Sequence, residues 1–323
     1  MKKILILTLG TILLLTACGE TPTATPTPLP TATATPLPPT VTASVTLTPS
    51  ATSTFTATAS PIPTATWVKQ GPGAVMVPIL LYHRIDYSET DNRYYVTPEK
   101  FEDQMKLLHD WEYTSITTEM LVNAITKGTK LPPRPVLITI DDGNLDNYTN
   151  AYPIMQKYGF TGVLYLVNNY VGYDKYMNKE QILEMVAAGW EVGSHSMNHF
   201  DLKAISSEQQ RNEIVESREL LEKLLGVPVK TFAYPFGSRN ASAYDYVHFA
   251  KYIAAMGADG FTADQGMGNL FSLQRCEIKG TEDARTFIRF LPWHGDLSYL
   301  PTDTATPTVT VTWTPKPTWT SKP

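Results

Sequence analysis

Cysteine is almost absent from this 323-residue sequence, occurring only as Cys18 and Cys276. A network of disulfide bonds is therefore excluded, and the fold must be stable on its hydrophobic core alone. Basic clusters are absent as well, and the net charge is −5, which argues against nucleic acid as a partner. An apolar run at residues 4–15 is too short to cross a bilayer, so it predicts no transmembrane helix.

The N-terminus has the pattern of a cleaved signal. Lys2 and Lys3 precede the apolar run, which ends in Leu15, Thr16, Ala17 and Cys18. This ending resembles the lipobox of bacterial lipoproteins, an interpretation that we favour over an ordinary secretory signal. The resemblance implies that residues 1–17 are removed and that Cys18 is lipidated. We therefore expect a protein at the bacterial cell surface, attached to the membrane by its lipid anchor only and facing outside the cytoplasm.

Two segments rich in threonine and proline flank the centre of the chain. Residues 21–66 contain no charged side chain, and a similar composition returns at residues 301–323. Such segments bury too little apolar surface to offset the entropy lost on ordering, so we expect disordered linkers over 18–66 and 301–323. In a polyproline conformation the first would reach about 140 Å, at about 3.1 Å per residue.

The central residues 67–300 alternate predicted strands with predicted helices. At about 230 residues, this region suits one large α/β domain better than two small ones. Helices are expected after the caps Thr97, Asn178 and Ser206, and again over 246–256. The alternation predicts parallel strands in a barrel. The strand candidates are residues 75–83, 113–117, 135–140, 161–167, 191–196, 229–235, 260–264 and 275–279.

Polar residues gather at the expected carboxyl ends of these strands. Asp141 and Asp142 follow the apolar run at residues 135–138, and His195 and Pro235 end two later strands. In (β/α) barrels the loops at these ends carry the chemistry. Two adjacent carboxylates lose hydration there, and this loss is unfavourable unless a counter-charge or a metal ion offsets it.

A divalent metal ion would provide that compensation. His195 and His199 are four residues apart, so a helical turn would place both imidazoles on one face. Two imidazoles and a carboxylate suit Zn²⁺ best, with Co, Ni or Mn as alternatives. The acidic pair Asp141 and Asp142 is the candidate source of the carboxylate. The Asp pair alone also fits a turn or a helix cap, and the His pair alone also fits a surface pair. Their joint occurrence at strand ends predicts a metal site.

Three motifs then stand in a characteristic order: TIDDG at 139–143, HSMNH at 195–199 and FAYPFG at 232–237. They resemble the motifs of the polysaccharide deacetylases, the NodB-homology group or carbohydrate esterase family 4. The opening PILLYHRI at 78–85 is similar to the branch with a Tyr-His opening, and the resemblance covers most of residues 75–292. It implies an irregular (β/α) barrel of about seven strands and metal-dependent removal of N-acetyl groups from a polysaccharide.

The resemblance also implies roles for individual residues. Asp142, His195 and His199 would hold the metal, and Asp141 would be the general base that deprotonates the metal-bound water. This division is physically sensible, because a ligating carboxylate has its lone pairs engaged while its neighbour stays free. The third motif would line the substrate and oxyanion site with Tyr234, Pro235 and Phe236.

The sequence departs from the main branch of the family in its third motif, and the fourth family motif, an Asp-x-x-Asp-Trp pattern, is not evident. Ala233 stands where that branch has an arginine that orients the catalytic aspartate. Arg275 is a candidate substitute, although a surface salt bridge explains it equally well. The acid that protonates the leaving amine is also undefined; His83 is preferred over His294, with packing in the barrel wall as the alternative for both.

Several aromatic residues are candidates for stacking on sugar rings. Tyr170, Tyr173 and Tyr176 lie on a predicted loop and are the better candidates. Trp293 is another, whereas core packing is expected of Trp190.

The leading hypothesis is a monomeric, metal-dependent polysaccharide deacetylase, a hydrolase of carbon–nitrogen bonds other than peptide bonds. One alternative is an O-acetyl esterase on a xylan-type polymer. The other is a surface glycan-binding protein that has lost catalysis, as the missing arginine suggests.

Overall fold

The computed structural model describes residues 71–90, 92–258, 260 and 262–297. The predicted signal peptide, Cys18 and both Thr/Pro-rich segments lie outside these residues. Within them, no helix has the length and apolar character needed to cross a membrane.

The main sheet is parallel throughout and curled. It runs in the order β10-β9-β8-β7-β6-β2-β12, and β5 pairs with β6 beside this path. A bridge between Met256 and Leu273 links β10 to the segment that precedes β12. The predicted (β/α) barrel is thereby confirmed. Its strands are β2 (Ile79–Tyr82), β5 (Thr114–Ser115), β6 (Pro135–Asp142), β7 (Val163–Leu166), β8 (Glu191–Ser194), β9 (Thr231–Ala233), β10 (Ala254–Met256) and β12 (Cys276–Glu277).

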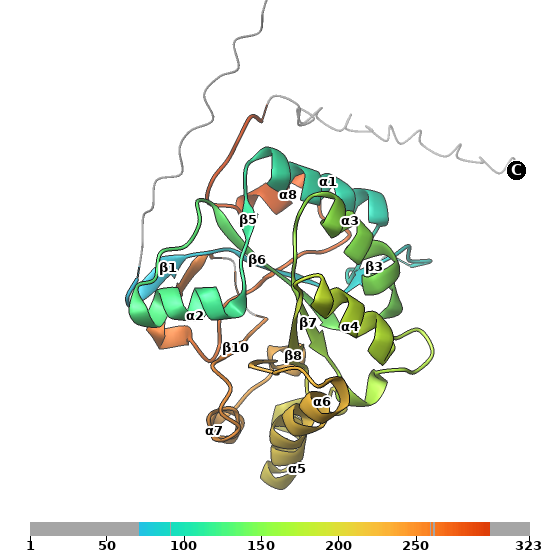
Figure 1. The fold of residues 1–323 in the computed structure, drawn as a ribbon, viewed down its shortest axis with the longest axis vertical. Coiled ribbons are helices and arrows are strands. Elements are labelled where there is room, and N and C mark those ends of the chain that lie inside the picture. The colour runs from blue at the N-terminus through green and yellow to red at the C-terminus, as the bar shows by residue number, and fades with distance from the viewer. Residues whose placement is uncertain (1–70, 91, 259, 261, 298–323) are drawn as a thin grey trace, which may run out of the picture. The chain divides into compact units, whose positions relative to one another are not determined.

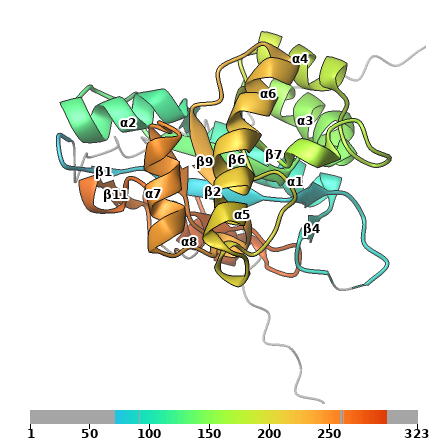
Figure 2. The same ribbon diagram turned by 90° about the horizontal axis from the view of Figure 1, so that it is seen from below.

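Helices surround the strands (Figures 1 and 2). The expected caps are present: Thr97 accepts a hydrogen bond from the backbone of Lys100, and Asn178 and Ser206 each begin a capping box. The helices are α1 (Pro98–Asp110), α2 (Thr118–Lys127), α3 (Tyr152–Lys157), α4 (Lys179–Ala187), α5 (Ser207–Arg211), α6 (Ser217–Leu225), α7 (Ala241–Phe249) and α8 (Ala284–Arg289).

Strand β6 determines where the acidic pair lies. Its residues are buried from Pro135 to Asp141, as expected of a central parallel strand covered on both faces. In the register with β7, Asp141 pairs with Tyr165 and Asp142 with Leu166. The two carboxylates therefore stand at the carboxyl end of the sheet.

Three predicted elements were wrong in extent or type. The single strand expected at 75–83 is two strands, β1 (Ala74–Met76) and β2, because Pro78 lacks the N–H needed to continue a ladder. Strand β1 pairs outside the main sheet with β11 (Asp264–Gly266), which replaces the strand expected at 260–264.

The helix expected at 246–256 is also shorter than predicted. Helix α7 ends at Phe249, and the chain turns at Lys251, which has a φ of 60°. Residues 254–256 then pair with β9 as the buried strand β10. Their burial against β9 outweighs the helical propensity of two alanines and a methionine.

Candidate active site

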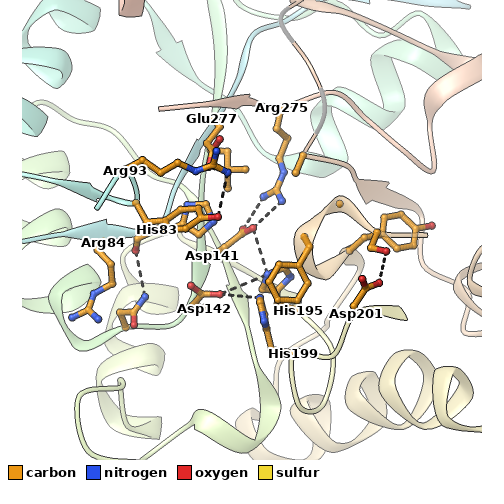
Figure 3. A pocket seen from close by; sticks show the side chains of 18 of the residues that line it. His83, Arg84, Arg93, Asp141, Asp142, His195, His199, Asp201, Arg275 and Glu277 are labelled. Carbon is orange, nitrogen blue, oxygen red and sulfur yellow. Dashed lines mark hydrogen bonds and ion pairs between the residues drawn. The ribbon is translucent and has the colours of Figure 1, made fainter. Parts of the chain in front are cut away.

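A cavity of about 890 Å³ opens at the carboxyl ends of the strands (Figure 3). Most of the site residues proposed from the sequence line it. Five further charged residues of the wall were not predicted from the sequence, although Arg84 directly follows His83 and Asp201 lies two residues after His199. These five are Arg84, Arg93, Asp201, Lys203 and Glu277.

Three potential metal ligands converge in this cavity. Asp142, His195 and His199 each offer one atom, and the three atoms lie within 4.8 Å of one another. The Oδ1 of Asp142 is 3.7 Å from the Nε2 of His195 and 3.4 Å from that of His199. This oxygen is buried and accepts no hydrogen bond among the described residues. Ligands that share one ion at about 2.1 Å are spaced in this way, so the three residues fit a divalent metal.

The backbone fixes the orientation of His195. Its Nδ1 lies 2.8 Å from the carbonyl oxygen of Ala233, so the Nδ1–H donates to that oxygen and Nε2 is left as the ligating atom. Ala233, which stands in place of the expected arginine, therefore contributes to the site through its backbone carbonyl.

The helical turn considered for residues 195–199 does not form. Residues 195–199 are irregular, and Ser196 and His199 have φ values of 69° and 61°. The two rings still meet, with centroids 4.8 Å apart. The loop, rather than a helix face, brings the imidazoles together.

Burial sets the protonation of the ligands. It lowers the pKa of His195 to about 3 and also lowers the pKa of His199, so both rings are neutral, the form that binds metals. Burial, followed by the charge of Asp141, raises the pKa of Asp142 to about 7. A bound dication would stabilise the ionised form of Asp142 against both effects.

Arg275 pairs with Asp141 inside the barrel. Its two terminal nitrogens lie 2.7 and 2.8 Å from the two carboxylate oxygens, and its Nε donates to the carbonyl of Gly257. The side chain of Arg275 is only 1% exposed, so the surface salt bridge considered for it was wrong. Burial by itself raises the pKa of Asp141, but the charge of the Arg275 guanidinium and its hydrogen bonds to the carboxylate bring the value to about 2.

His83 lines the cavity with a neutral ring. Burial lowers the pKa of His83 to about 4, against the opposing effect of the Asp141 charge. Its ring packs against Tyr94 at 4.7 Å, and its Nδ1 is buried without a hydrogen-bond partner among the described residues.

Other expectations for the site were wrong. His294 is not part of the cavity wall, because its Nε2 interacts with the carbonyl of Leu291 and its ring lies against Trp111. Pro235 is buried outside the wall. Trp293 is buried against Tyr113.

The remaining aromatic candidates divide between wall, rim and core. Tyr234 lines the wall, and Phe236 is 65% exposed with its ring 4.6 Å from that of His199. Tyr176 also lines the cavity, and the ring of Tyr170 packs against the ring of Tyr176. Trp190 is buried, as expected.

A second cavity of about 400 Å³ adjoins the first, because Arg84 and Tyr95 line both. Arg84 is fixed by its ion pair with Asp146 at 2.6 Å and by packing over the Tyr95 ring. The two cavities therefore share a wall formed by Arg84 and Tyr95.

Comparisons with known proteins agree with this geometry. Residues 128–255, which include the Asp pair and both histidines, match the family model described as polysaccharide deacetylase. This chain therefore contains a region similar to the polysaccharide deacetylases. Bacillus subtilis YxkH, whose name assigns it provisionally to these deacetylases, is 29% identical over 67% of this chain and 75% of its own.

Two further proteins are similar to the same region. The poly-β-1,6-N-acetyl-D-glucosamine N-deacetylase of Staphylococcus aureus is 29% identical over 47% of this chain and 57% of its own length. The Streptococcus pyogenes deacetylase PplD, solved in complex with acetate, superposes with a TM-score of 0.63 at 25% identity. That match covers 67% of this chain and 98% of PplD.

Proposed function

We propose that the protein is a metal-dependent hydrolase that removes N-acetyl groups from a polysaccharide. The observation that carries this proposal is the convergence of Asp142, His195 and His199 beside a separate carboxylate, Asp141, which Arg275 keeps ionised. Relatives named as polysaccharide deacetylases support the same reaction.

The residues divide the work as follows. A divalent ion held by Asp142, His195 and His199 would polarise the acetyl carbonyl and lower the pKa of the attacking water. Asp141 accepts the proton of that water, since its low pKa leaves it ionised across the neutral range. His83 faces the same cavity and is our candidate to protonate the leaving amine. Because its ring is neutral, His83 would first have to take up a proton, and the proton that Asp141 removes from the water supplies it.

The substrate is proposed to be a polymer of N-acetylated sugars. The S. aureus relative, named for poly-β-1,6-N-acetyl-D-glucosamine, supports this class. The adjoining cavity offers space for a neighbouring sugar, with Tyr95 as a stacking surface and Arg84 as a hydrogen-bond donor. We also propose that the protein acts as a monomer.

Acetate release with and without chelator tests the activity. The purified protein is expected to release acetate from N-acetylglucosamine polymers, to lose this activity in a chelator and to regain it with Zn²⁺, the ion favoured by two imidazoles and a carboxylate. Elemental analysis would identify the native metal among Zn, Co, Ni and Mn. Greater release from an O-acetylated xylan would favour the esterase alternative. Metal and glycan binding without acetate release from either polymer would favour a silent binding protein.

We further propose that acyl chains on Cys18 attach the protein to the outer side of a bacterial membrane. The full-length protein is expected to incorporate labelled fatty acid in a bacterial host and to sediment with membranes, since two or more acyl chains give stable anchoring. Cys18→Ala should abolish both, whereas Cys276→Ala should change neither. Labelling that survives Cys18→Ala would contradict the proposal.

A further inference from the structure

The loop that carries both metal-ligating histidines has an unfavourable backbone conformation. Ser196 and His199 adopt left-handed φ values, which are sterically unfavourable for residues other than glycine. Such a conformation persists only where surrounding contacts hold it. From one side, the backbone N–H groups of Asn168 and Asn169 donate to the carbonyls of Ser196 and Met197.

From the other side, a single carboxylate holds the loop. One oxygen of Glu213 accepts the backbone N–H groups of Met197 and Asn198 at 3.0 and 2.8 Å. Its other oxygen accepts the side-chain amide of Asn198 at 2.7 Å. The amide oxygen of Asn198 in turn accepts a hydrogen bond from Asn169, which fixes the orientation of that amide. Three N–H donors therefore meet a group that can only accept.

Local helix geometry brings Glu213 to this position. The residue lies in a π-helical segment, Asn212–Glu216, between α5 and α6. A π-helical turn is wider than an α-helical turn, so it changes which side chains face inward. Such segments are frequent at functional sites. Glu213 is only 3% exposed, so its burial depends on those three hydrogen bonds.

We propose that Glu213 is a positioning residue for the metal site. Its carboxylate clamps the backbone between His195 and His199, so that both Nε2 atoms converge on Asp142. This inference rests on the proposed function, because it requires that the three residues bind a metal. Glu213 itself is not among the described residues that line the cavity. Partners that orient metal ligands typically change metal affinity by about 10- to 100-fold.

The first test is Glu213→Gln, which keeps the shape of the side chain but turns one acceptor into a donor. Either orientation of the new amide leaves a donor of the loop unsatisfied. Zn²⁺ affinity of the full chain, measured by competition with a chromophoric chelator, is expected to fall about 10- to 100-fold. The melting temperature of the metal-free protein should be measured alongside it.

Exchange of the two side chains provides a rescue. In Glu213→Gln/Asn198→Asp the carboxylate and the amide change places, so every hydrogen bond between them can form with the same net charge. Asn198→Asp alone opposes two carboxylates and should also weaken Zn²⁺ binding. The double variant should bind within about threefold of the unsubstituted protein. If Glu213→Gln does not fold, the double variant decides: restored affinity supports the clamp, and weak binding by a folded protein overturns it.

A control at a partly buried carboxylate separates positioning of the loop from the general effect of losing a hydrogen-bonded charge. Glu191 also accepts hydrogen bonds, from the backbone N–H of Thr118 and from the Thr118 hydroxyl at 2.8 Å. Glu191 begins β8, whereas the histidine loop follows the carboxyl end of this strand. Glu191→Gln should leave Zn²⁺ affinity unchanged. Equal weakening in both variants, or a folded Glu213→Gln with unchanged affinity, would overturn the inference. Absence of Zn²⁺ binding by the unsubstituted protein would overturn the proposed function itself.

Discussion

Asp141→Asn is expected to reduce acetate release by about 10²- to 10⁴-fold while the metal stays bound. The carboxamide cannot accept a proton at neutral pH, whereas Asp142, His195 and His199 remain in place. The measurement pairs acetate release with elemental analysis of the same sample. Circular dichroism should establish that the variant is folded, because Asn also gives up the ion pair with Arg275.

Asp142→Asn is the matched control, since it makes the same chemical change one residue away. It removes the anionic ligand and should therefore lose both metal and activity. Metal loss confined to Asp141→Asn would reverse the two roles. Full activity in Asp141→Asn would remove Asp141 as the base.

Arg275→Met should destabilise the metal-free protein by about 3–5 kcal/mol at neutral pH. Arg275 and Asp141 are both almost fully buried, so the substitution leaves a carboxylate without its counter-charge. Urea unfolding gives the free energy, and the midpoint should fall with an unchanged slope. Acetate release should fall as well, because Asp141 loses its two fixed hydrogen bonds.

The loss should depend on pH in a defined direction. Burial raises the pKa of Asp141, but Arg275 is the largest opposing influence and the value is about 2, below the usual 3.8. A carboxyl with a lowered folded-state pKa stabilises the protein above about pH 4 and loses that contribution as the pH falls toward 2. Without Arg275, Asp141 takes up its proton at a higher pH. The difference between the two proteins should therefore shrink on acidification.

Three variants delimit this effect. Arg275→Lys keeps the charge but not the two parallel hydrogen bonds, so its stability should be intermediate. Arg275→Met/Asp141→Asn removes both charges and should recover part of the loss. Arg211→Met breaks the exposed pair with Glu216 and should cost less than about 1 kcal/mol. A cost for Arg275→Met no larger than for Arg211→Met would contradict the role of Arg275 at Asp141.

Local sequence patterns predicted the structure correctly where the requirement behind them is also local. The apolar run before Asp141 predicted a buried strand because a central parallel strand must be apolar on both faces. The caps at Thr97, Asn178 and Ser206 predicted helix starts because the first N–H groups of a helix need acceptors. The helix predicted over 246–256 was wrong at residues 254–256, where burial against β9 decided the conformation.

The sequence by itself determined the α/β fold class, the acidic pair at a strand end and the pair of histidines that can share a metal. Only the tertiary structure decided that Arg275 is the buried partner of Asp141, that Glu213 holds the histidine loop and that His294 lies outside the cavity. The physical reason is that strand and helix patterns follow from burial within a few residues. The partner of a buried charge depends on the register and curl of strands that are distant in sequence, and Arg275 and Asp141 are separated by 134 positions.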